Sequence, residues 1–390
     1  MTPAAKLRLA CVANFVLVLL SSRSSKCDMA VGDILPDDPD LYDKMHPPKI
    51  EGRPTVVYFH VTVMGLDSID ESSMTYAADI FFAQSWKDHR LRLPENMTAE
   101  YRLLEVGLLN RMWRPDSIFK NAKQVTFQTM TVPNHYIWLY RDKTILYMVK
   151  LTIVLTCAMN FASYPHDTQK CTMQMESLSH TTDDLVFHWD ENDPLVVHKD
   201  FELPQLDLEE TGLEDCTGIY STGNFTCLQL TFTLKRRLGY YMFHTYIPTC
   251  LIVIMSWVSF WIKPEAVPAR VTLAVTSLLT LCTQHAKSQA ALPPVSYIKA
   301  IDIFMSCCTV FVFASLMEYA IVNIILEGGD RAEVKCAKLC LNSDCLPPGP
   351  SPSQKGRKRA LLIDRVSRVV FPTTFIILNL SYWIFYVICA

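Results

Sequence analysis

Four residues in the second half of the chain, Thr272, Thr276, Leu279 and Thr283, are spaced by four, three and four positions. A helix with 3.6 residues per turn places all four along one face. Because the stretch is long enough to cross a membrane, its threonine face indicates contact with water rather than lipid. Several copies around an axis would line a pore, with Leu279 as its closing ring. The alternative is a polar helix packed inside a bundle, with its hydroxyls bonded to the backbone.

Charged residues near this stretch indicate which ions such a pore would accept. No carboxylate occurs between Glu265 and Asp302, whereas Arg270 and Lys287 lie near the two ends. A pore of this composition is expected to pass anions such as chloride. The residues predicted to line it are Pro268, Ala269, Arg270, Thr272, Thr276, Leu279 and Thr283.

The distribution of apolar residues places the chain in a membrane. Half of the 390 residues are hydrophobic, and they concentrate after residue 238. Hydrophobic runs at 239–262, 271–286, 303–317 and 369–389 approach the roughly 20 residues that cross a bilayer. They predict an integral membrane protein surrounded by the lipid bilayer. The formal net charge of -3 gives no indication of a nucleic-acid partner.

The start of the chain resembles an export signal. Lys6 and Arg8 precede the apolar run 9–20 and a serine-rich stretch, so residues 1–25 are predicted to be a cleaved signal peptide, with an uncleaved first span as the alternative. The region that follows is then extracellular. Two glycosylation sequons, at Asn96 and Asn224, lie in this exported part and agree with export.

Cysteine usage differs between the two halves. Cys157 with Cys171, and Cys216 with Cys227, form two closely spaced pairs in the exported region and are disulfide candidates in an oxidising compartment. Three further cysteines, Cys336, Cys340 and Cys345, lack a fourth ligand and regular spacing, so they are expected to be reduced or lipidated rather than bound to zinc. No metal and no cofactor are predicted.

The coarse organisation is a strand-rich part followed by helices. β-branched and aromatic runs at 56–63 and 144–156, separated by Pro, Asn and Asp, predict an all-β sandwich. The polar, cationic stretch 327–359 is expected to be a disordered cytoplasmic linker. Four spans then return the carboxyl terminus to the outside. The predicted boundaries are 1–25 (signal peptide), 26–238 (extracellular domain), 239–326 (transmembrane helices 1 to 3), 327–366 (cytoplasmic loop) and 367–390 (transmembrane helix 4).

Several motifs together resemble the Cys-loop family of pentameric ligand-gated ion channels. Cys157 and Cys171 enclose thirteen residues, with Phe161, Pro165 and Asp167 where that family keeps them. Further matches are Trp113-Arg114-Pro115-Asp116, Trp257-Val258-Ser259-Phe260-Trp261-Ile262, Leu292-Pro293-Pro294-Val295-Ser296-Tyr297 and Ile363-Asp364-Arg365-Val366-Ser367-Arg368. The resemblance implies a β-sandwich ligand-binding domain, a four-helix transmembrane bundle and assembly with four further subunits of the same or a related kind. It also implies a plasma-membrane receptor at a synapse, with the first cysteine loop lying against residues 292–297.

Within that family the chain is similar to the anion-selective branch. Pro268-Ala269-Arg270 stands where cation channels carry a glutamate near Ala269. A second disulfide, Cys216 to Cys227, across the binding loop is similar to glycine receptors and to invertebrate glutamate-gated and histamine-gated chloride channels.

The resemblance also implies where an agonist would bind, between two subunits. The principal side carries Glu176, Ser177, Leu178, Tyr220, Thr222 and Phe225, and the complementary side carries Phe81 and Tyr147. The Glu176 carboxylate and the faces of Tyr220 and Phe225 could hold an ammonium. The alternatives are a salt bridge at Glu176 and ordinary surface aromatics on a hairpin. Leu178 departs from the aromatic residue usual in the family.

A missing arginine favours an amine without a carboxylate. Receptors for glycine, glutamate and GABA hold the agonist carboxylate with an arginine where this chain has Ala83, helped by a hydroxyl where it has Met148. Burying a carboxylate without those partners costs several kcal/mol. The amino-acid sequences of residues 175–184 and 133–136 are most similar to those of arthropod histamine-gated chloride channels. A glutamate-gated or glycine-gated channel is the alternative agonist assignment, and a membrane-anchored β-sandwich adhesion module is the alternative class; no enzyme motif is found.

Overall fold

Alternating side chains bury one face of the first long strand, β1 (Thr55–Asp70). Val57, Phe59, Val61 and Val63 are fully buried, and the residues between them are at least partly exposed. A strand with one face on a hydrophobic core requires this two-residue period. The computed structural model describes residues 34–36, 42–93, 97, 99–198, 203–290, 292–340 and 352–388. The predicted signal peptide lies outside the described residues.

The strands form two main sheets, and β1 belongs to the larger one. The larger contains β1, β2 (Thr75–Lys87), β3 (Tyr101–Leu104), β5 (Ala122–Phe127), β6 (His135–Tyr140), β7 (Thr144–Thr156), β9 (Leu185–Trp189) and β10 (Leu195–Val197). Its order in the described part of the chain is β10, β1, β2, β7, β6, β3, with β9 also paired to β1 and β5 to β7. The smaller runs β11 (Leu206–Asp215), β14 (Cys227–Arg236), β8 (Thr168–Ser177), β4 (Ser117–Phe119). A 3-10 helix lies at Val106–Asn110, and β12 (Gly218–Tyr220) and β13 (Gly223–Phe225) form a separate hairpin.

Aromatic side chains from both sheets meet in one core. Tyr76 of β2 packs edge-on against Phe232 of β14 with ring centroids 6.2 Å apart, and Phe82 of β2 contacts Phe119 of β4 at 5.1 Å. The Cys157–Cys171 disulfide joins the end of β7 to β8 and therefore links the two sheets covalently. The predicted β-sandwich is confirmed, and so are both predicted disulfides, the second being Cys216–Cys227.

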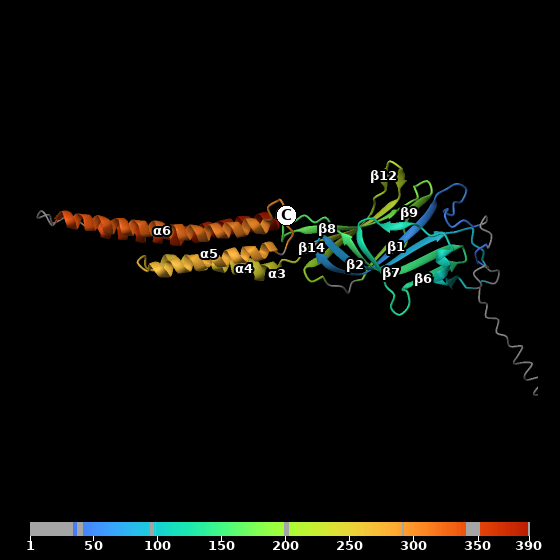
Figure 1. The fold of residues 1–390 in the computed structure, drawn as a ribbon, viewed down its shortest axis with the longest axis horizontal. Coiled ribbons are helices and arrows are strands. Elements are labelled where there is room, and N and C mark those ends of the chain that lie inside the picture. The colour runs from blue at the N-terminus through green and yellow to red at the C-terminus, as the bar shows by residue number, and fades with distance from the viewer. Residues whose placement is uncertain are drawn as a thin grey trace, which may run out of the picture.

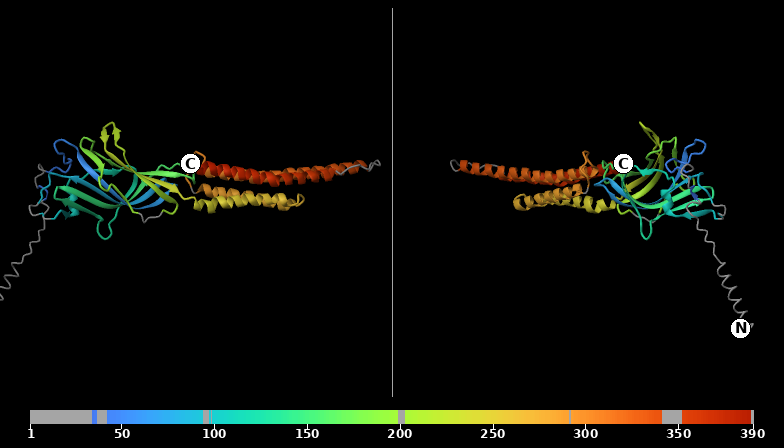
Figure 2. Two further views of the ribbon diagram at one scale, coloured as in Figure 1. Left: turned by 180° about the vertical axis from the view of Figure 1, so that it is seen from behind. Right: turned by 45° about the vertical axis from the view of Figure 1, so that its right-hand side comes forward.

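Long helices extend away from the sandwich, side by side, as Figures 1 and 2 show. They are α3 (Gly239–Tyr241), a π-helical turn at Met242–Tyr246, α4 (Ile247–Trp257), a 3-10 turn at Val258–Trp261, α5 (Val267–Ala290), α6 (Ala300–Cys340) and α7 (Pro352–Ile388). Within the described residues, three stretches are long and apolar enough to cross a membrane: Gly239–Trp261, Ala300–Gly329 and Gln354–Tyr386. α5 has 24 residues and is long enough too, but its polar stripe makes it less apolar than these three.

The prediction of a disordered linker at 327–359 is wrong over the part that the structure describes. α6 continues to Cys340 and α7 begins at Pro352, so the boundaries expected at 326 and 367 cut both helices short. A Cβ on Gly356 of α7 would lie 3.4 Å from the Cα of Gly329 in α6, so glycine lets the two helices approach closely. Ala, Glu, Lys and Leu in 331–340 favour helix as well. Cys345 lies outside the described residues.

The first cysteine loop, 157–171, rests on the helical part. The Ala300 amide donates to the Ala162 carbonyl at 3.0 Å, and the Phe161 amide donates to the Tyr297 hydroxyl at 2.9 Å. The prediction that this loop lies against residues 292–297 is therefore confirmed. These bonds connect the strand domain to the start of α6 and to the segment before it.

The end of α7 returns to the same junction, where the chain end is marked in Figure 1. The ring of His166 stacks on that of Tyr386 with centroids 5.9 Å apart. The hydroxyls of Tyr246 and Tyr382 are 2.8 Å apart. The carboxyl end of α7 thus lies on the same side of the helical bundle as the strand domain.

Candidate functional site

The candidate binding site is built around a buried carboxylate near the end of β8. Glu176 is 8% exposed, and its direct partners in the sheet are Ile118 of β4 and Cys227 of β14. A buried carboxylate is costly unless charged or hydrogen-bonding groups compensate it. Its side-chain partners therefore define the site.

Lys120 and Tyr220 both contact the Glu176 carboxylate. Lys120 Nζ lies 2.6 Å from Oε2 of Glu176, and the Tyr220 hydroxyl donates to Oε1 at 2.9 Å. Lys120 Nζ also donates to the Tyr220 hydroxyl at 2.7 Å and lies 5.4 Å from the centre of that ring. The bonds to Glu176 and Tyr220 raise the pKa of Lys120 above its ordinary value, although partial burial opposes this. The site therefore already contains an ammonium.

The hairpin β12–β13 covers this site. The rings of Tyr220 and Phe225 meet edge-on with centroids 5.6 Å apart. A Cβ on Gly218 would lie 2.8 Å from the Tyr220 ring, so only glycine leaves room for the ring there. The predicted residues Tyr220 and Phe225 thus lie together beside Glu176.

The tip of the hairpin is tied to the loop after β8 and is otherwise open. The Thr182 amide donates to the Asn224 carbonyl at 2.9 Å. Thr222 and the Asn224 side chain are exposed. Glycosylation of Asn224 stays a prediction, as does that of Asn96, which lies outside the described residues.

Asp116 organises the loop that follows Glu176. Its carboxylate accepts bonds from the hydroxyls of Ser177 at 3.0 Å and Ser179 at 2.6 Å, and His180 Nδ1 lies 3.2 Å away. Burial opposes ionisation of Asp116, but the hydrogen bonds from Ser179, His180 and Ser177 together outweigh it and lower the pKa of this carboxyl. Ser177, predicted to bind agonist, is 2% exposed and occupied in this network. The next residue, Leu178, is exposed.

Strand register defines a second face, on β2 and β7. Ala83 pairs with Met148, and Phe81 pairs with Lys150. Directly opposed side chains lie on the same face of a sheet. Tyr136 of β6 also pairs with Met148, and its hydroxyl lies 3.0 Å from the Met148 sulfur. Ala83 stands where other receptors of the resembled family have a carboxylate-binding arginine, and Met148 where they have a hydroxyl. The two residues are direct neighbours across the strands, and both side chains are apolar.

Tyr147 lies on the opposite face of the sheet from Phe81, so these two predicted residues do not share one surface of the sheet. Its partner is Gln84, and the two line a cavity of about 600 Å³ with Phe82 and Val149. Successive side chains of a strand alternate between faces, so Tyr147 cannot share the face of its neighbour Met148. Met148, and not Tyr147, lies on the face that carries Phe81 and Ala83.

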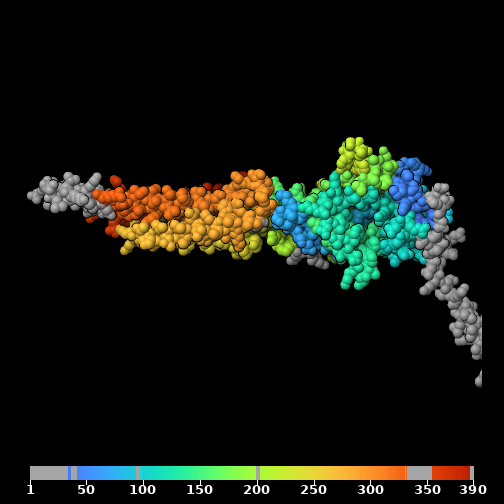
Figure 3. All heavy atoms as spheres, viewed as in Figure 1, coloured from blue at the N-terminus to red at the C-terminus, as the bar shows by residue number. Residues whose placement is uncertain are grey.

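The predicted polar stripe of α5 is exposed in the single subunit. Its members Thr272, Thr276, Leu279 and Thr283 are all exposed, Leu279 at 64%. Pro268 and Ala269 are exposed at the start of the helix, and the opposite face buries Ala274, Ser277 and Leu281. Figure 3 shows α5 in amber at the surface of the helical end. The stripe is thus available to face an axis shared with other subunits.

Comparison with protein-family models identifies both parts of the chain. Residues 32–238 match the neurotransmitter-gated ion-channel ligand binding domain, which is more than half of the chain. Residues 245–338 match the neurotransmitter-gated ion-channel transmembrane region. The chain belongs to the neurotransmitter-gated ion-channel family. Membership implies a small-molecule ligand and an oligomer, and the fold fits the pentamer expected of this family.

Arg270 of the channel subunit does not lie on the exposed stripe, contrary to prediction. It is fully buried, and its guanidinium contacts the Asp364 carboxylate at 2.7 and 3.0 Å. Its Nε donates to the Ile262 carbonyl at 3.0 Å. Arg270 precedes Thr272 by two residues, which is a rotation of roughly 200° about the helix axis. Its charge is therefore neutralised between α5 and α7 and does not lie on the threonine stripe.

Two lysines near the binding faces of the channel subunit were not singled out from the sequence. Lys120 comes to Glu176 because Ile118, two residues earlier, is the residue opposite Glu176 in the sheet. Lys150 lies with its Nζ 5.8 Å from the centre of the Phe81 ring. Both follow from strand register between segments distant in sequence. One sequence signal could have located Lys150. Residues two apart in a strand share a face, so Lys150 lies on the face of Met148, as Phe81 lies on that of Ala83.

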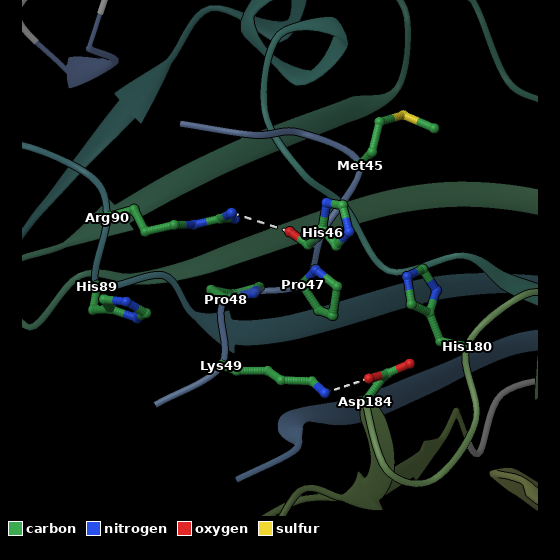
Figure 4. A pocket seen from close by; sticks show the side chains of 9 residues that line it. All are labelled: Met45, His46, Pro47, Pro48, Lys49, His89, Arg90, His180 and Asp184. Atoms are coloured by element: carbon green, nitrogen blue, oxygen red, sulfur yellow. Dashed lines mark hydrogen bonds and ion pairs between the residues drawn. The ribbon is translucent and has the colours of Figure 1, made fainter. Parts of the chain in front are cut away.

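A separate pocket of about 460 Å³ lies between the amino-terminal segment and the loop carrying His180 (Figure 4). Arg90 donates to the His46 carbonyl at 3.0 Å, and Lys49 is ion-paired with Asp184. Three histidines line this pocket, but no cluster suited to a metal ion occurs among the described residues of the channel subunit. These contacts fasten the amino-terminal segment to the loop that Asp116 organises.

Proposed function

We propose that this subunit forms an anion channel opened by histamine, which binds between neighbouring subunits. The observation that carries the agonist assignment is the ammonium of Lys120 already held by Glu176 and Tyr220. The Glu176 carboxylate and the hydroxyl and ring face of Tyr220 bind the ammonium of Lys120, so they are chemically suited to bind the ammonium of an agonist as well. Histamine offers an ammonium and an imidazole.

The face expected to complete the site supports an agonist without a carboxylate. Ala83 and Met148 are paired and apolar, so they offer no ion pair or hydroxyl bond to an anion. Burying a carboxylate against them would cost several kcal/mol. Glycine, glutamate and GABA each carry a carboxylate, and histamine does not.

One observation favours the second candidate, a channel gated by an amino acid such as glutamate or glycine. Lys150 lies on the same face as Ala83, beside Phe81, and it forms no ion pair with a carboxylate of the described residues. An ammonium at this position could hold an agonist carboxylate. Histamine remains favoured because Ala83 and Met148 stand where an arginine and a hydroxyl would be needed to bind an agonist carboxylate.

Anion passage is supported by the composition of α5. Its first turn contains no acidic residue, and Lys287 lies in its last turn. Glu265, the nearest carboxylate before it, is ion-paired with Arg357 at 2.9 Å. Asp364 neutralises Arg270, so Arg270 of several subunits would not form a ring of positive charge around a pore. The proposal of anion selectivity therefore rests on the absence of an acidic residue in the first turn of α5, which contains Pro268 and Ala269.

The proposed location is the plasma membrane at a synapse, with the strand domain and both termini outside the cell. Two disulfides in the strand domain favour an oxidising compartment. The end of α7 lies on the side of the strand domain, which agrees with an even number of crossings. Chloride is the proposed permeant ion.

An agonist panel tests the proposal. The chain is expressed alone, and currents are recorded as histamine, glutamate, glycine and GABA are applied in turn. We expect large currents with histamine and small ones with the three amino acids. Glu176→Gln should raise the half-maximal histamine concentration by about ten- to a hundred-fold, because a charge-assisted bond contributes about 1.5 to 3 kcal/mol. Strong activation by glutamate or glycine without histamine would point to Lys150 and reject the proposal.

A further inference from the structure

We propose that Lys120 is a built-in competitor of the agonist, which must displace its ammonium from Glu176 and Tyr220 before the site can be filled. This inference rests on the proposed function, since it concerns an agonist that carries an ammonium. It assigns to Lys120 the role of setting agonist sensitivity.

The contacts of Lys120 are those expected of a bound ammonium. Its Nζ lies 2.6 Å from a Glu176 carboxylate oxygen, 2.7 Å from the Tyr220 hydroxyl and 5.4 Å from the centre of the Tyr220 ring. These three interactions use the carboxylate, the phenol and the aromatic ring together. An agonist ammonium cannot make them while Lys120 remains, because the two cations would occupy the same volume.

The environments of the two charged groups explain why the lysine can leave. The side chain of Glu176 is 10% exposed, whereas that of Lys120 is 41% exposed. The carboxylate is therefore fixed inside the sheet, while the ammonium can swing into water, where it is well solvated. Lys120 stands just after β4, where its amide still donates to the Gln174 carbonyl at 2.9 Å, so its backbone stays in place when the side chain moves.

Competition by Lys120 predicts the direction in which the apparent agonist affinity changes when the lysine is removed. The apparent affinity for an agonist falls by the fraction of sites free to receive it. If Lys120 occupies the site most of the time, removing its charge should raise the apparent affinity. A residue that merely positions Glu176 and Tyr220 would have the opposite effect, because its loss would disorder the site.

The test compares histamine concentration–response curves of the whole receptor carrying Lys120→Met, Lys120→Arg or neither. Lys120→Met should lower the half-maximal histamine concentration by about three- to ten-fold. Lys120→Arg retains a cation and should stay near the parent. Lys123→Met is the matched control, since Lys123 is an exposed lysine three residues away whose Nζ donates to the Ser73 carbonyl at 3.2 Å and, within the part of the chain that the structure describes, to no carboxylate. It should leave the curve unchanged.

A second background separates competition from a general effect on gating. With Glu176→Gln already present, the partner of the lysine has lost its charge, so Lys120→Met should shift the curve much less than in the parent. An unchanged or higher half-maximal concentration for Lys120→Met in the parent overturns the inference while leaving histamine gating intact. Currents with glutamate but none with histamine, in parent and Lys120→Met alike, overturn the proposed function and the competition together.

Discussion

The guanidinium of Arg270 in α5 and the carboxylate of Asp364 in α7 form an ion pair of 2.7 Å, and both side chains are almost completely buried. The pair joins the helix that carries the threonine stripe to the helix at the outside of the bundle. It places a fixed cation and its counter-ion behind the stripe rather than on it.

Removing one partner of this pair should destabilise the bundle. Asp364→Asn leaves the Arg270 charge buried without its anion, which costs about 3 to 5 kcal/mol. We expect a severe loss of surface receptor, measured by labelling intact cells. Arg365→Gln, at the exposed neighbouring position, is the control and should keep parental levels. Parental surface expression of Asp364→Asn would show that the pair is dispensable.

A carboxylate at the start of α5 should change ion selectivity. Ala269 is exposed there, next to Pro268, and no acidic residue lies in the first turn. Ala269→Glu would place a ring of negative charges at the mouth, which should weaken or invert the preference for anions. Reversal potentials in graded sodium chloride measure the effect, with Ala269→Gln as the uncharged control. Equal selectivity in the two variants would place the selective region elsewhere.

The Leu279 ring should close the resting pore. Leu279→Thr makes the ring polar, so the constriction no longer excludes water and the closed state loses stability. A shift of about 1.4 kcal/mol would raise the current without agonist about ten-fold. Val310→Thr on α6 provides a control, since Val310 is also 64% exposed but lies on another helix. If Leu279→Thr gates like the parent, the constriction lies at Thr272 or Pro268.

The disulfide between the sheets should be required for a working receptor. The Cys157–Cys171 loop contacts α6 through Ala162 and Ala300, and the cross-link stabilises the strand domain by about 3 kcal/mol. Replacing both cysteines with serine should abolish surface expression or agonist-evoked current. Cys307→Ser, at a free cysteine of α6, serves as the control. Normal expression with unchanged currents in the double variant would remove the bond from the account.

Local patterns predicted the parts of the structure that depend on one segment. The two-residue alternation of β1 and the spacing of Thr272, Thr276 and Thr283 fix their faces without any long-range contact. The family motif predicts Arg270 in the pore, but the helical period puts it opposite Thr272, behind the stripe. The alternation of faces within β7 likewise puts Tyr147 and Met148 on opposite sides of the sheet.

Features that depend on pairing between distant segments could not be predicted in this way. Lys120 and Glu176 are 56 positions apart, and they meet because β4 pairs with β8 in one particular register. Gly329 and Gly356 lie in a stretch whose composition is typical of a linker. In the structure they let α6 and α7 approach closely, which is a contact between distant segments. Strand register and helix packing each depend on two segments, so the residue composition of one segment does not determine them.

The most direct test of the central claim is the reversal potential of the histamine-evoked current as external chloride is replaced by a large, impermeant anion. An anion channel opened by histamine predicts a large current whose reversal potential shifts by about 59 mV for each ten-fold change in chloride, the value that the relation ΔG = −nFΔE gives for one charge. Replacing sodium should leave the reversal potential unchanged. No current with histamine, or a reversal potential that follows sodium, would contradict the account.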